Sequence, residues 1–390
     1  MTSHVLPTYN RAPIAFERGE GAWAITADGT RYLDLGAGIG VNALGHANPD
    51  LVATLTEQAG RIWHVSNLYQ IPQQERLADL LCEHTFADRA FITNSGTEAA
   101  ELAIKMVRKY WSDRDEPDRN EIVTIEGAFH GRSTGAIAAA GSEKMTKGFG
   151  PLMPGFRSIP WGDPDALIGA ITDRTAAVML EPVQGEGGIR PVPDDELRAI
   201  RAACDKTGAL LVLDEVQCGM GRTGRLFAHE YAGITPDIMM VAKGIGGGFP
   251  LGAVLATDAV AAPMAVGSHG STYGGNPLAC AVGSRVMEII ADPAFLAEVN
   301  RKAALFRQKL EGLVAAHPDV FEGVRGTGLM LGLKCKIPPV DVVNAGYAQH
   351  LLTVPAADNV VRILPPLTIT DQEIAEAVAR LDKAAATLAP

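Results

Sequence analysis

Two charged residues, Asp214 and Lys243, each end a short apolar run and are well placed to do chemistry. Asp214 follows the run 209–213, and Lys243 follows the run 238–242. Turn residues bound both runs, which is typical of buried strands in a parallel sheet. Open α/β sheets hold their ligands at the carboxyl ends of such strands. We therefore expect this carboxylate and this amine to lie at the same edge of one sheet.

A carboxylate beside a buried amine suits the chemistry of pyridoxal phosphate. Enzymes of this kind use a lysine to bind the cofactor aldehyde and an acidic residue to keep the ring nitrogen protonated. Burial of Lys243 would also favour its neutral, nucleophilic form. Each residue alone has a simpler explanation, because an aspartate after a strand is usually a helix cap and a lysine before glycines is usually exposed. The prediction therefore depends on the pair.

Two further segments could serve a flat phosphorylated ligand. Ser95, Gly96 and Thr97 lie between a predicted strand and a predicted helix, where N–H groups and hydroxyls can hold a phosphate. Such a sequence is more often a simple helix cap. Phe129 and Arg132 place an aromatic face beside a cation, but in isolation a buried Phe and a surface Arg are the more common explanation. A ligand-binding role for either segment is therefore predicted only because a cofactor is already expected.

Two glutamates, Glu181 and Glu186, follow the apolar run 176–180 at another predicted strand end. They could be surface charges of a loop, or they could hold an arginine or a substrate amine. Gln217, three residues after the aspartate of the opening pair, adds a hydrogen-bonding side chain near the predicted cofactor. These residues extend the predicted site along the carboxyl edge of the sheet.

A glycine pattern at 36–40 is the main competing signal. It partly matches a dinucleotide fingerprint, but the third glycine comes one position early and no good helix start follows. No Walker-type Gly-Lys-Ser/Thr sequence occurs in the chain. An NAD-dependent oxidoreductase therefore remains a remote alternative from another class.

Composition restricts the cellular setting. The 390 residues suggest more than one subdomain, and the net charge of −11 argues against binding to nucleic acid or anionic membranes. Five scattered cysteines without a Cys-x-x-Cys pair indicate a reducing compartment, with neither a disulfide framework nor a zinc site. The first residues lack a signal-peptide pattern, and no apolar stretch is long enough to span a membrane. We expect a cytoplasmic protein that needs no metal.

Strand-like and helix-like segments alternate from Pro72 to residue 256, which predicts a parallel sheet with helices on both faces. Residues 72–84 form the first predicted helix of this region. The predicted strands are 90–93, 121–125, 176–180, 209–213, 238–242 and 251–256. This region would form the cofactor-binding core.

The pattern changes beyond Asn276. A long helical stretch precedes strand-like residues 324–333 and 360–364, and the last helix opens with a capping box at Thr370 and Glu373. We predict a division into an N-terminal segment that packs with the small domain, a large cofactor-binding domain and a small α+β domain. Their ranges are 1–46, 47–275 and 276–390.

With these residues in place, the chain resembles the class III pyridoxal phosphate aminotransferases from Gly19 to Pro366, which is nearly its full length. The matching motifs lie at 28–34, 41–46, 66–69, 94–99, 129–132, 181–186, 213–217, 242–244, 271–277 and 361–366. In this order they are highly specific for the class and moderately specific for the substrate. The resemblance implies an α/β fold of type I, with a large, mostly parallel sheet between helices and a smaller α+β domain.

The resemblance also implies roles at the cofactor. Lys243 would bind the cofactor covalently and carry protons, while Asp214 would pair with the ring nitrogen and Gln217 with the phenolic oxygen. Phe129 and Val216 would pack on the two faces of the ring. The residues that would hold the phosphate are Ser95, Gly96, Thr97 and Thr272, the last from the partner subunit. A homodimer with shared active sites is therefore expected.

For the substrates, the resemblance implies amino transfer from N2-acetyl-L-ornithine to 2-oxoglutarate, a step of arginine biosynthesis. Arg132 would bind the far carboxylate of either substrate, and Arg362 would bind only the α-carboxylate of glutamate. Glu186 would neutralise Arg362 when the other donor is bound, since an unpaired buried charge is unfavourable. The small apolar segment 38–41 replaces a tyrosine of the ornithine-specific relatives, which favours an acylated donor.

Several alternatives keep the cofactor but change the reaction. The amino donor could be succinylornithine, succinyldiaminopimelate, free ornithine or 4-aminobutyrate, and a more distant relative would be an aminomutase acting on glutamate semialdehyde. A non-catalytic sensor with the same fold is another possibility. The residues quoted above identify the cofactor more strongly than they identify the donor.

Overall fold

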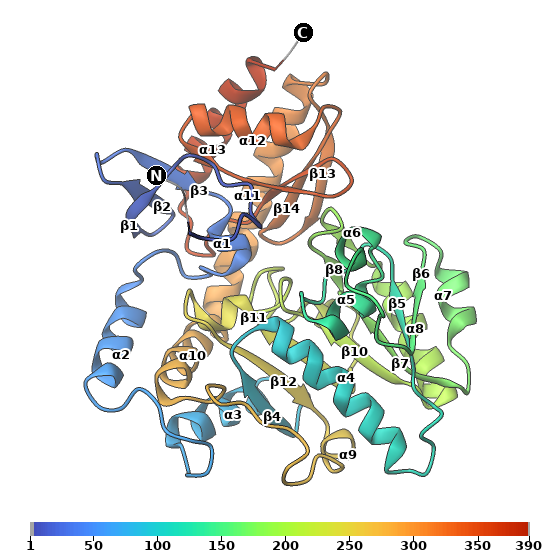
Figure 1. The fold of residues 1–390 in the computed structure, drawn as a ribbon. Coiled ribbons are helices and arrows are strands. Elements are labelled where there is room, and N and C mark those ends of the chain that lie inside the picture. Colours follow the sequence, from blue (N-terminus) through green and yellow to red (C-terminus); the bar gives the residue numbers. More distant parts are fainter. Residues whose placement is uncertain (1–3, 389–390) are drawn as a thin grey trace.

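A seven-stranded sheet forms the centre of the lower part of the molecule in Figure 1. The computed structural model, which describes residues 4–388, orders its strands β4-β12-β11-β10-β7-β5-β6. The bounds are β4 Arg89–Thr93, β5 Glu121–Ile125, β6 Phe156–Ile159, β7 Thr175–Leu180, β10 Leu210–Asp214, β11 Ile238–Ala242 and β12 Gly252–Ala256. The predicted strands are therefore present, and the predicted α/β class is confirmed.

One strand of this sheet explains why the sheet is mostly parallel, as predicted, and not wholly parallel. β12 runs antiparallel to both of its neighbours, β11 and β4, whereas the remaining neighbouring strands are parallel. The connection from β11 to β12 is short and contains only the 3-10 helix η2 Lys243–Gly246. A parallel neighbour would need a crossover of a dozen or more residues, so this connection can only return antiparallel. The sheet is mostly parallel rather than wholly so.

Helices cover both faces of the large sheet because its strands are apolar on both sides. In β10, Leu210 and Val212 pack into the cluster of α4, while Leu211 and Leu213 pack into the cluster of α8. Alternate residues of a strand point to opposite faces, which explains this division. The helices of this part are α2 Pro49–Ala59, α3 Pro72–Glu83, α4 Gly96–Ser112, α5 Thr134–Ala140, α7 Pro164–Ala170, α8 Asp194–Thr207 and α10 Pro277–Ile290. The predicted helix 72–84 is confirmed as α3.

A smaller antiparallel sheet, ordered β13-β14-β17-β16, lies in the upper part of Figure 1. Its strands and flanking helices are β13 Phe321–Thr327, β14 Met330–Cys335, β16 Val354–Ala356, β17 Val360–Ile363, α11 Pro293–Ala316, α12 Pro339–Ala348 and α13 Asp371–Ala386. The predicted single strand 324–333 is wrong in one respect, because Gly328 adopts a positive φ of 59° and turns the chain into a hairpin. The capping box of Thr370 and Glu373 is present at the start of α13.

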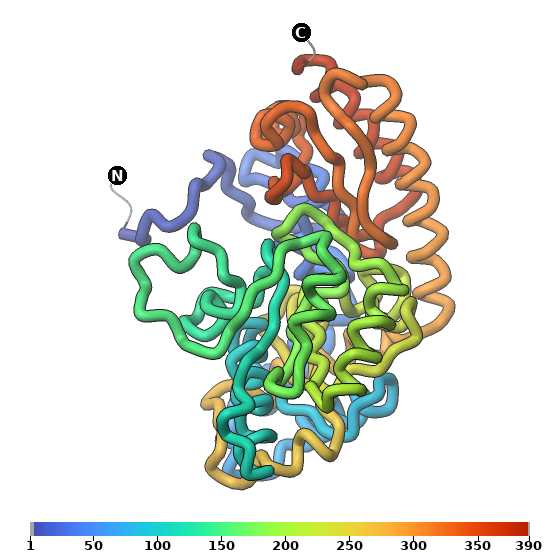
Figure 2. Tube along the Cα trace, turned by 90° about the vertical axis from the view of Figure 1, so that its right-hand side faces the viewer, coloured from blue at the N-terminus to red at the C-terminus, as the bar shows by residue number. Residues whose placement is uncertain are grey.

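The N-terminal strands lie beside the C-terminal part of the chain. The strands β1 Phe16–Glu20, β2 Trp23–Thr26 and β3 Arg31–Asp34 form a sheet that β15 Leu351–Leu352 completes, with Leu351 paired to Leu33. Figure 2 shows this blue segment next to the orange and red end of the chain. The division at 46/47 and 275/276 stays a prediction, and residues 1–3 and 389–390 lie outside the described residues.

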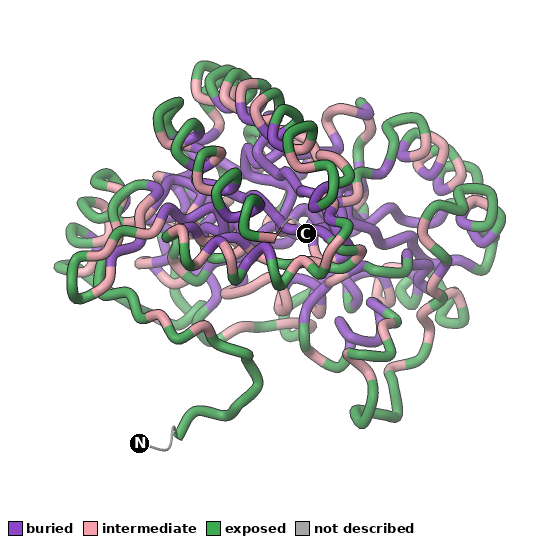
Figure 3. Tube along the Cα trace, turned by 90° about the horizontal axis from the view of Figure 1, so that it is seen from above, coloured by how far each residue is buried: buried purple, intermediate pink, exposed green. Residues whose placement is uncertain are grey.

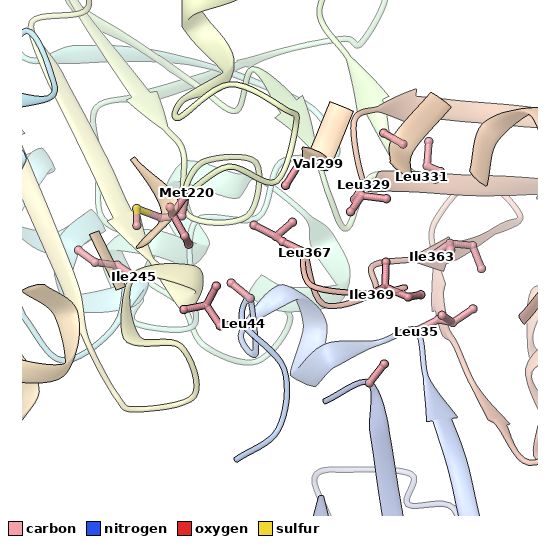
Figure 4. Close-up of a cluster of buried hydrophobic side chains, with 14 of the residues drawn as sticks. Leu35, Leu44, Met220, Ile245, Val299, Leu329, Leu331, Ile363, Leu367 and Ile369 are labelled. Carbon is pink, nitrogen blue, oxygen red and sulfur yellow. The ribbon is translucent and has the colours of Figure 1, made fainter. Parts of the chain in front are cut away.

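One hydrophobic cluster joins the parts of the molecule. Figure 4 shows Leu35 and Leu44 from the N-terminal segment close to Ile363 and Leu367, while Met220 comes from the loop after β10. Burial of such a shared cluster stabilises the arrangement of the two sheets by the hydrophobic effect. The N-terminal segment, the loop after β10 and the small sheet are thereby packed together.

Figure 3 shows a buried interior and an exposed N-terminal stretch at residues 4–11. Within residues 4–388, no helix combines the length and the apolar character that a membrane span requires. The remaining short elements are α1 Ala37–Gly40, α6 Glu143–Thr146, β8 Val183–Gln184, β9 Arg190–Pro191, η1 Ala228–Tyr231 and α9 Asp258–Ala261. Of these, β8 and β9 matter for function because they frame the loop that carries Glu186.

Candidate active site

Asp214 and Lys243 line the same cavity, which has a volume of about 320 Å³. They meet there because β10 and β11 are parallel neighbours whose carboxyl ends lie at one edge of the sheet. The predicted cofactor residues that line this cavity are Ser95, Gly96, Thr97, Phe129, Asp214, Val216, Gln217 and Lys243. Of the predicted cofactor residues, only Thr272 is not part of its wall.

Lys243 is enclosed by protein, and its side chain is partly exposed only where it faces the cavity. Burial lowers the pKa of its ammonium group, and the positive charge of Arg362 acts in the same direction. Within residues 4–388, its amine makes no hydrogen bond or ion pair. An amine of this kind is available as a nucleophile and as a proton carrier.

Asp214 is buried, and its carboxylate is held by two contacts. Oδ1 accepts a hydrogen bond from the Val216 N–H at 3.0 Å, and Oδ2 lies 2.7 Å from Nδ1 of His130. Burial alone lowers the pKa of His130, but the hydrogen bond to Asp214 and the negative charges of Asp214 and Glu181 together outweigh burial and raise that pKa. Nε2 of His130 is buried without a partner. His130 thus orients Asp214 and supports its negative charge.

Glu181 lines the cavity and links two loops. Its Oε2 accepts a hydrogen bond from the Phe129 N–H at 3.0 Å, and its Oε1 accepts one from the Gly185 N–H at 3.2 Å. Burial raises the pKa of Glu181 to about 7, and the nearby charge of Asp214 adds to this effect. The carboxyl group therefore fixes the aromatic residue on one side and the base of the Glu186 loop on the other.

The start of helix α4 forms an anion-binding end of the cavity. Ser95 caps the helix by accepting a hydrogen bond from the Glu98 N–H at 3.2 Å, so the simpler explanation of this residue also holds. Thr97 accepts a hydrogen bond from the Arg132 N–H at 3.3 Å. Gly131, at a φ of 132°, permits this close approach, because a Cβ there would overlap Thr97. The free N–H groups of the first helical turn suit a phosphate.

Arg362 and Glu186 form an ion pair next to this cavity, although 176 positions separate them in the sequence. Arg362 lies on β17 and is almost fully buried, and its Nη1 is 2.5 Å from Oε1 of Glu186. The same nitrogen is 3.4 Å from Oε1 of Gln217, which lines the cavity. Nε of Arg362 is buried and has no partner. Nη2 donates a hydrogen bond to Pro355 O at 3.2 Å, so Glu186 is the anionic partner of this guanidinium group.

Four predicted site residues are not part of the cavity wall: Arg132 and Thr272, and also Glu186 and Arg362, which form the ion pair beside it. Arg132 is exposed, with its guanidinium carbon 5.5 Å from the centre of the Phe129 ring. Thr272 is exposed in the loop that follows Ser271, and Ser271 is 3.3 Å from the side-chain amide of Asn94. The roles of Arg132 in substrate binding and of Thr272 in a partner's site stay predictions.

The structure also adds residues that the sequence did not single out. His130 lies inside the motif 129–132, but nothing in the sequence indicated its contact with Asp214, 84 positions away. Glu181 was recognised as a strand-end charge but not as a link between loops. Phe249 lines the cavity without any chemical signature in the sequence. Its position depends on packing and not on a motif.

The cavity fits pyridoxal phosphate on its own observations. It combines an aromatic face at Phe129, an apolar face at Val216, an anion-binding helix start, a fixed carboxylate and an unpaired amine. The volume of about 320 Å³ is within the range for small-ligand sites.

Known proteins are similar to this chain over nearly its whole length. The family described as Aminotransferase class-III matches residues 6–385. An acetylornithine aminotransferase from Rhodobacter capsulatus is 70% identical over 388 residues, which cover 100% of this chain and 99% of that protein. The structure of N-acetylornithine aminotransferase from Stenotrophomonas maltophilia matches with 40% identity and a TM-score of 0.86, covering 97% of both chains.

A structure of ornithine aminotransferase from Toxoplasma gondii, described as containing partially occupied PLP at its active site, is also similar. It is 32% identical, has a TM-score of 0.94 and covers 98% of this chain and 92% of its own. An α/β sheet with an unpaired lysine and a fixed aspartate at its carboxyl edge defines a pyridoxal phosphate enzyme of fold type I. The chain belongs to the class III aminotransferase family, and its cofactor is pyridoxal 5'-phosphate.

Proposed function

We propose that the protein transfers the terminal amino group of N2-acetyl-L-ornithine to 2-oxoglutarate. The products are N-acetyl-L-glutamate 5-semialdehyde and L-glutamate, and the step belongs to arginine biosynthesis. The observation that carries this proposal is the buried ion pair of Arg362 and Glu186 beside the cavity. Support comes from the 70% identity to a protein described as an acetylornithine aminotransferase.

Pyridoxal phosphate, when bound, supplies an aldehyde and an electron-accepting ring. Lys243 would hold the cofactor and, once the substrate amine has replaced it, would move a proton at the reacting carbon. Asp214, oriented by His130, would keep the ring nitrogen protonated. Phe129 and Val216 would cover the two ring faces, and the start of α4 would hold the phosphate.

The two substrates differ in charge next to the reacting carbon. Glutamate carries a carboxylate there, and acetylornithine carries only a methylene chain. Arg362 would bind the glutamate carboxylate when Glu186 turns away, and Glu186 would neutralise Arg362 when acetylornithine is bound. The pair thus lets one buried arginine serve both halves of the reaction, with Arg132 binding the distant carboxylate.

The wall near Val41 favours an acylated donor. Val41 lines the cavity, and the neighbouring segment 38–41 contains small and apolar residues. An apolar side chain cannot hydrogen-bond the free α-ammonium group of ornithine, and leaving that charge unpaired is unfavourable. An acylated amine has no such charge, so it fits this wall better.

We also propose a homodimer with shared sites. Exposed apolar side chains gather near the loop of Thr272, at Trp63, Leu68, Tyr69 and Tyr273. The amide of Asn67 donates hydrogen bonds to Ser271 O and Gly274 O, which joins these segments into one surface. A second copy that covers this surface would place its Thr272 at the phosphate.

The five unpaired thiols support a reducing compartment, for which we propose the cytoplasm.

Single-turnover absorbance of the bound cofactor tests the proposed donor. The purified holoenzyme should react with N-acetyl-L-ornithine at least about tenfold faster than with free L-ornithine or 4-aminobutyrate. Free ornithine leaves its α-ammonium group unpaired, and 4-aminobutyrate lacks the acylamino group altogether. N-succinyl-L-ornithine and N-succinyl-L,L-diaminopimelate belong in the same series. A clear preference for free ornithine would rule out the proposed donor but leave the family assignment intact.

Glu186→Ala should separate the two half-reactions. Without Glu186, Arg362 is left as a buried unpaired cation whenever the acetylated donor is bound, which lowers that half-reaction by about 10²-fold. The glutamate half-reaction should change by less than about threefold, since Arg362 still finds its carboxylate. Glu57→Ala, which breaks an exposed ion pair with Arg61, is the matched control and should change neither rate. Equal losses in both half-reactions would contradict this role.

A further inference from the structure

The Glu186 loop, residues 185–190, is docked on the small sheet by an apolar side chain. Ile189 is fully buried and lies against Gly326 of β13 and Gly332 of β14. A Cβ at Gly326 would come within 2.7 Å of Ile189 Cγ2, and one at Gly332 within 3.1 Å of Ile189 Cγ1. The two glycines therefore leave the space that Ile189 occupies. This contact ties a loop of the large sheet to the small sheet.

Asp358 adds an ionic contact between the same two parts. Its carboxylate is 2.6 Å from Arg325 Nη1, 2.7 Å from Lys334 Nζ and 3.5 Å from Nη2 of Arg190, the last residue of the Glu186 loop. Burial alone raises the pKa of Asp358, but hydrogen bonds from Lys334 and Arg325 outweigh burial and hold that pKa well below its usual range. Asp358 is therefore ionised at neutral pH, and a single carboxylate joins three cations.

The main chain supplies a third contact at the same turn. The Ala357 N–H donates a hydrogen bond to Glu186 O at 3.0 Å. Gly188, at a φ of 111°, lies so close to Ala357 that a Cβ would come within 2.7 Å of its carbonyl oxygen. Arg362 follows on β17, which begins directly after this turn at Val360. One turn of the small sheet thus locates both members of the Glu186–Arg362 pair.

We propose that Asp358 is a positioning residue that sets the strength of the Glu186–Arg362 pair and thereby the balance between the two amino donors. Ile189 and the Ala357 hydrogen bond hold two points of the loop, and Asp358 holds its end at Arg190, so the three contacts together place the Glu186 side chain against Arg362. A weaker anchor at Asp358 allows Glu186 to drift from Arg362, which disfavours the acylated donor and not glutamate. This inference rests on the proposed function of the pair.

Asp358→Asn removes the charge and keeps the shape of the side chain. The half-reaction with the acetylated donor should fall by about fivefold, because the Glu186 loop loses its ionic contact with the small sheet through Arg190. KM for glutamate should stay unchanged or fall by about twofold, because Arg362 is then less strongly held by Glu186. In the Glu186→Ala background, Asp358→Asn should change neither half-reaction, since the residue it positions is already missing.

A merely structural role would give a different pattern. It would lower both half-reactions together, and the loss would persist in the Glu186→Ala background; either result overturns the proposal, as does an unchanged enzyme. Asp371→Asn, which breaks an exposed pair with Arg301 in the same part of the fold, is the control. If Asp358→Asn does not fold, Arg190→Gln carries the same test from the loop side. A wild-type holoenzyme that does not react with the acetylated donor would instead refute the proposed function.

Discussion

Lys243→Ala is expected to lower amino transfer by at least about 10⁴-fold in both half-reactions. Lys243 is the unpaired amine in the wall of the cavity, and burial lowers its pKa so that it can act as both nucleophile and proton carrier. Alanine cannot hold the cofactor covalently or move a proton at the reacting carbon. The cavity itself stays, because Phe129, Val216 and the start of α4 belong to other elements.

Two measurements on this variant separate the two roles. After treatment with borohydride, the wild-type chain should gain the mass of the cofactor, and the Lys243→Ala chain should not. Single-turnover rates with glutamate give the loss of proton transfer, and added small amines should restore part of it. Lys383→Ala, an exposed lysine on α13, should behave like the wild type. A variant that keeps a tenth of the wild-type rate would exclude Lys243 as the central base.

Asp214→Asn is expected to lower both half-reactions by about 10²–10³-fold. Asparagine keeps the size of the side chain and can still bond the Val216 N–H and His130, which lie 3.0 Å and 2.7 Å from the two carboxylate oxygens. It has no negative charge, however, so it cannot keep the ring nitrogen of the cofactor protonated. The loss of rate therefore reports the removal of the negative charge at position 214 and not a change in the geometry of the site.

The pattern of losses distinguishes this variant from Glu186→Ala. The ring serves both substrates, so Asp214→Asn should reduce both half-reactions to a similar extent, while the affinity for the cofactor changes less. Rates of both half-reactions and an absorbance titration of the cofactor provide the comparison. Asp205→Asn, an exposed residue on α8, should leave all three quantities unchanged. A loss confined to one substrate would show that Asp214 acts on the substrate and not on the ring.

Much of the fold could be predicted because local patterns determine it. Apolar runs marked β10 and β11, and the capping box marked the start of α13. Two details were not predicted, and both occur where a short connection or a single glycine reverses the direction of the chain. The chain between β11 and β12 is too short for a crossover, and Gly328 divides one predicted strand into β13 and β14. Such details depend on neighbours in space as much as on periodicity.

The candidate site also combines features that the sequence predicts with contacts that depend on the folded structure. The strand-end positions of Asp214 and Lys243 follow from the order of residues along the chain, because parallel strands end at one edge. The contacts of His130 with Asp214 and of Glu181 with two loops could not be predicted. They join residues that are distant in sequence, and the order of the strands and the packing of the loops decide which of them meet.

By itself, the sequence determined the α/β class, the pyridoxal phosphate chemistry and the resemblance to the class III aminotransferases. These conclusions depend on residue types at strand ends, which can be recognised in the sequence as short local motifs. The resemblance also implied that Glu186 pairs with Arg362. Only the tertiary structure decided that one turn of the small sheet locates both members of this pair and that Asp358 joins this turn to the Glu186 loop. These contacts connect two different sheets, and their energies come from burial and charge pairing that exist only after the chain has folded.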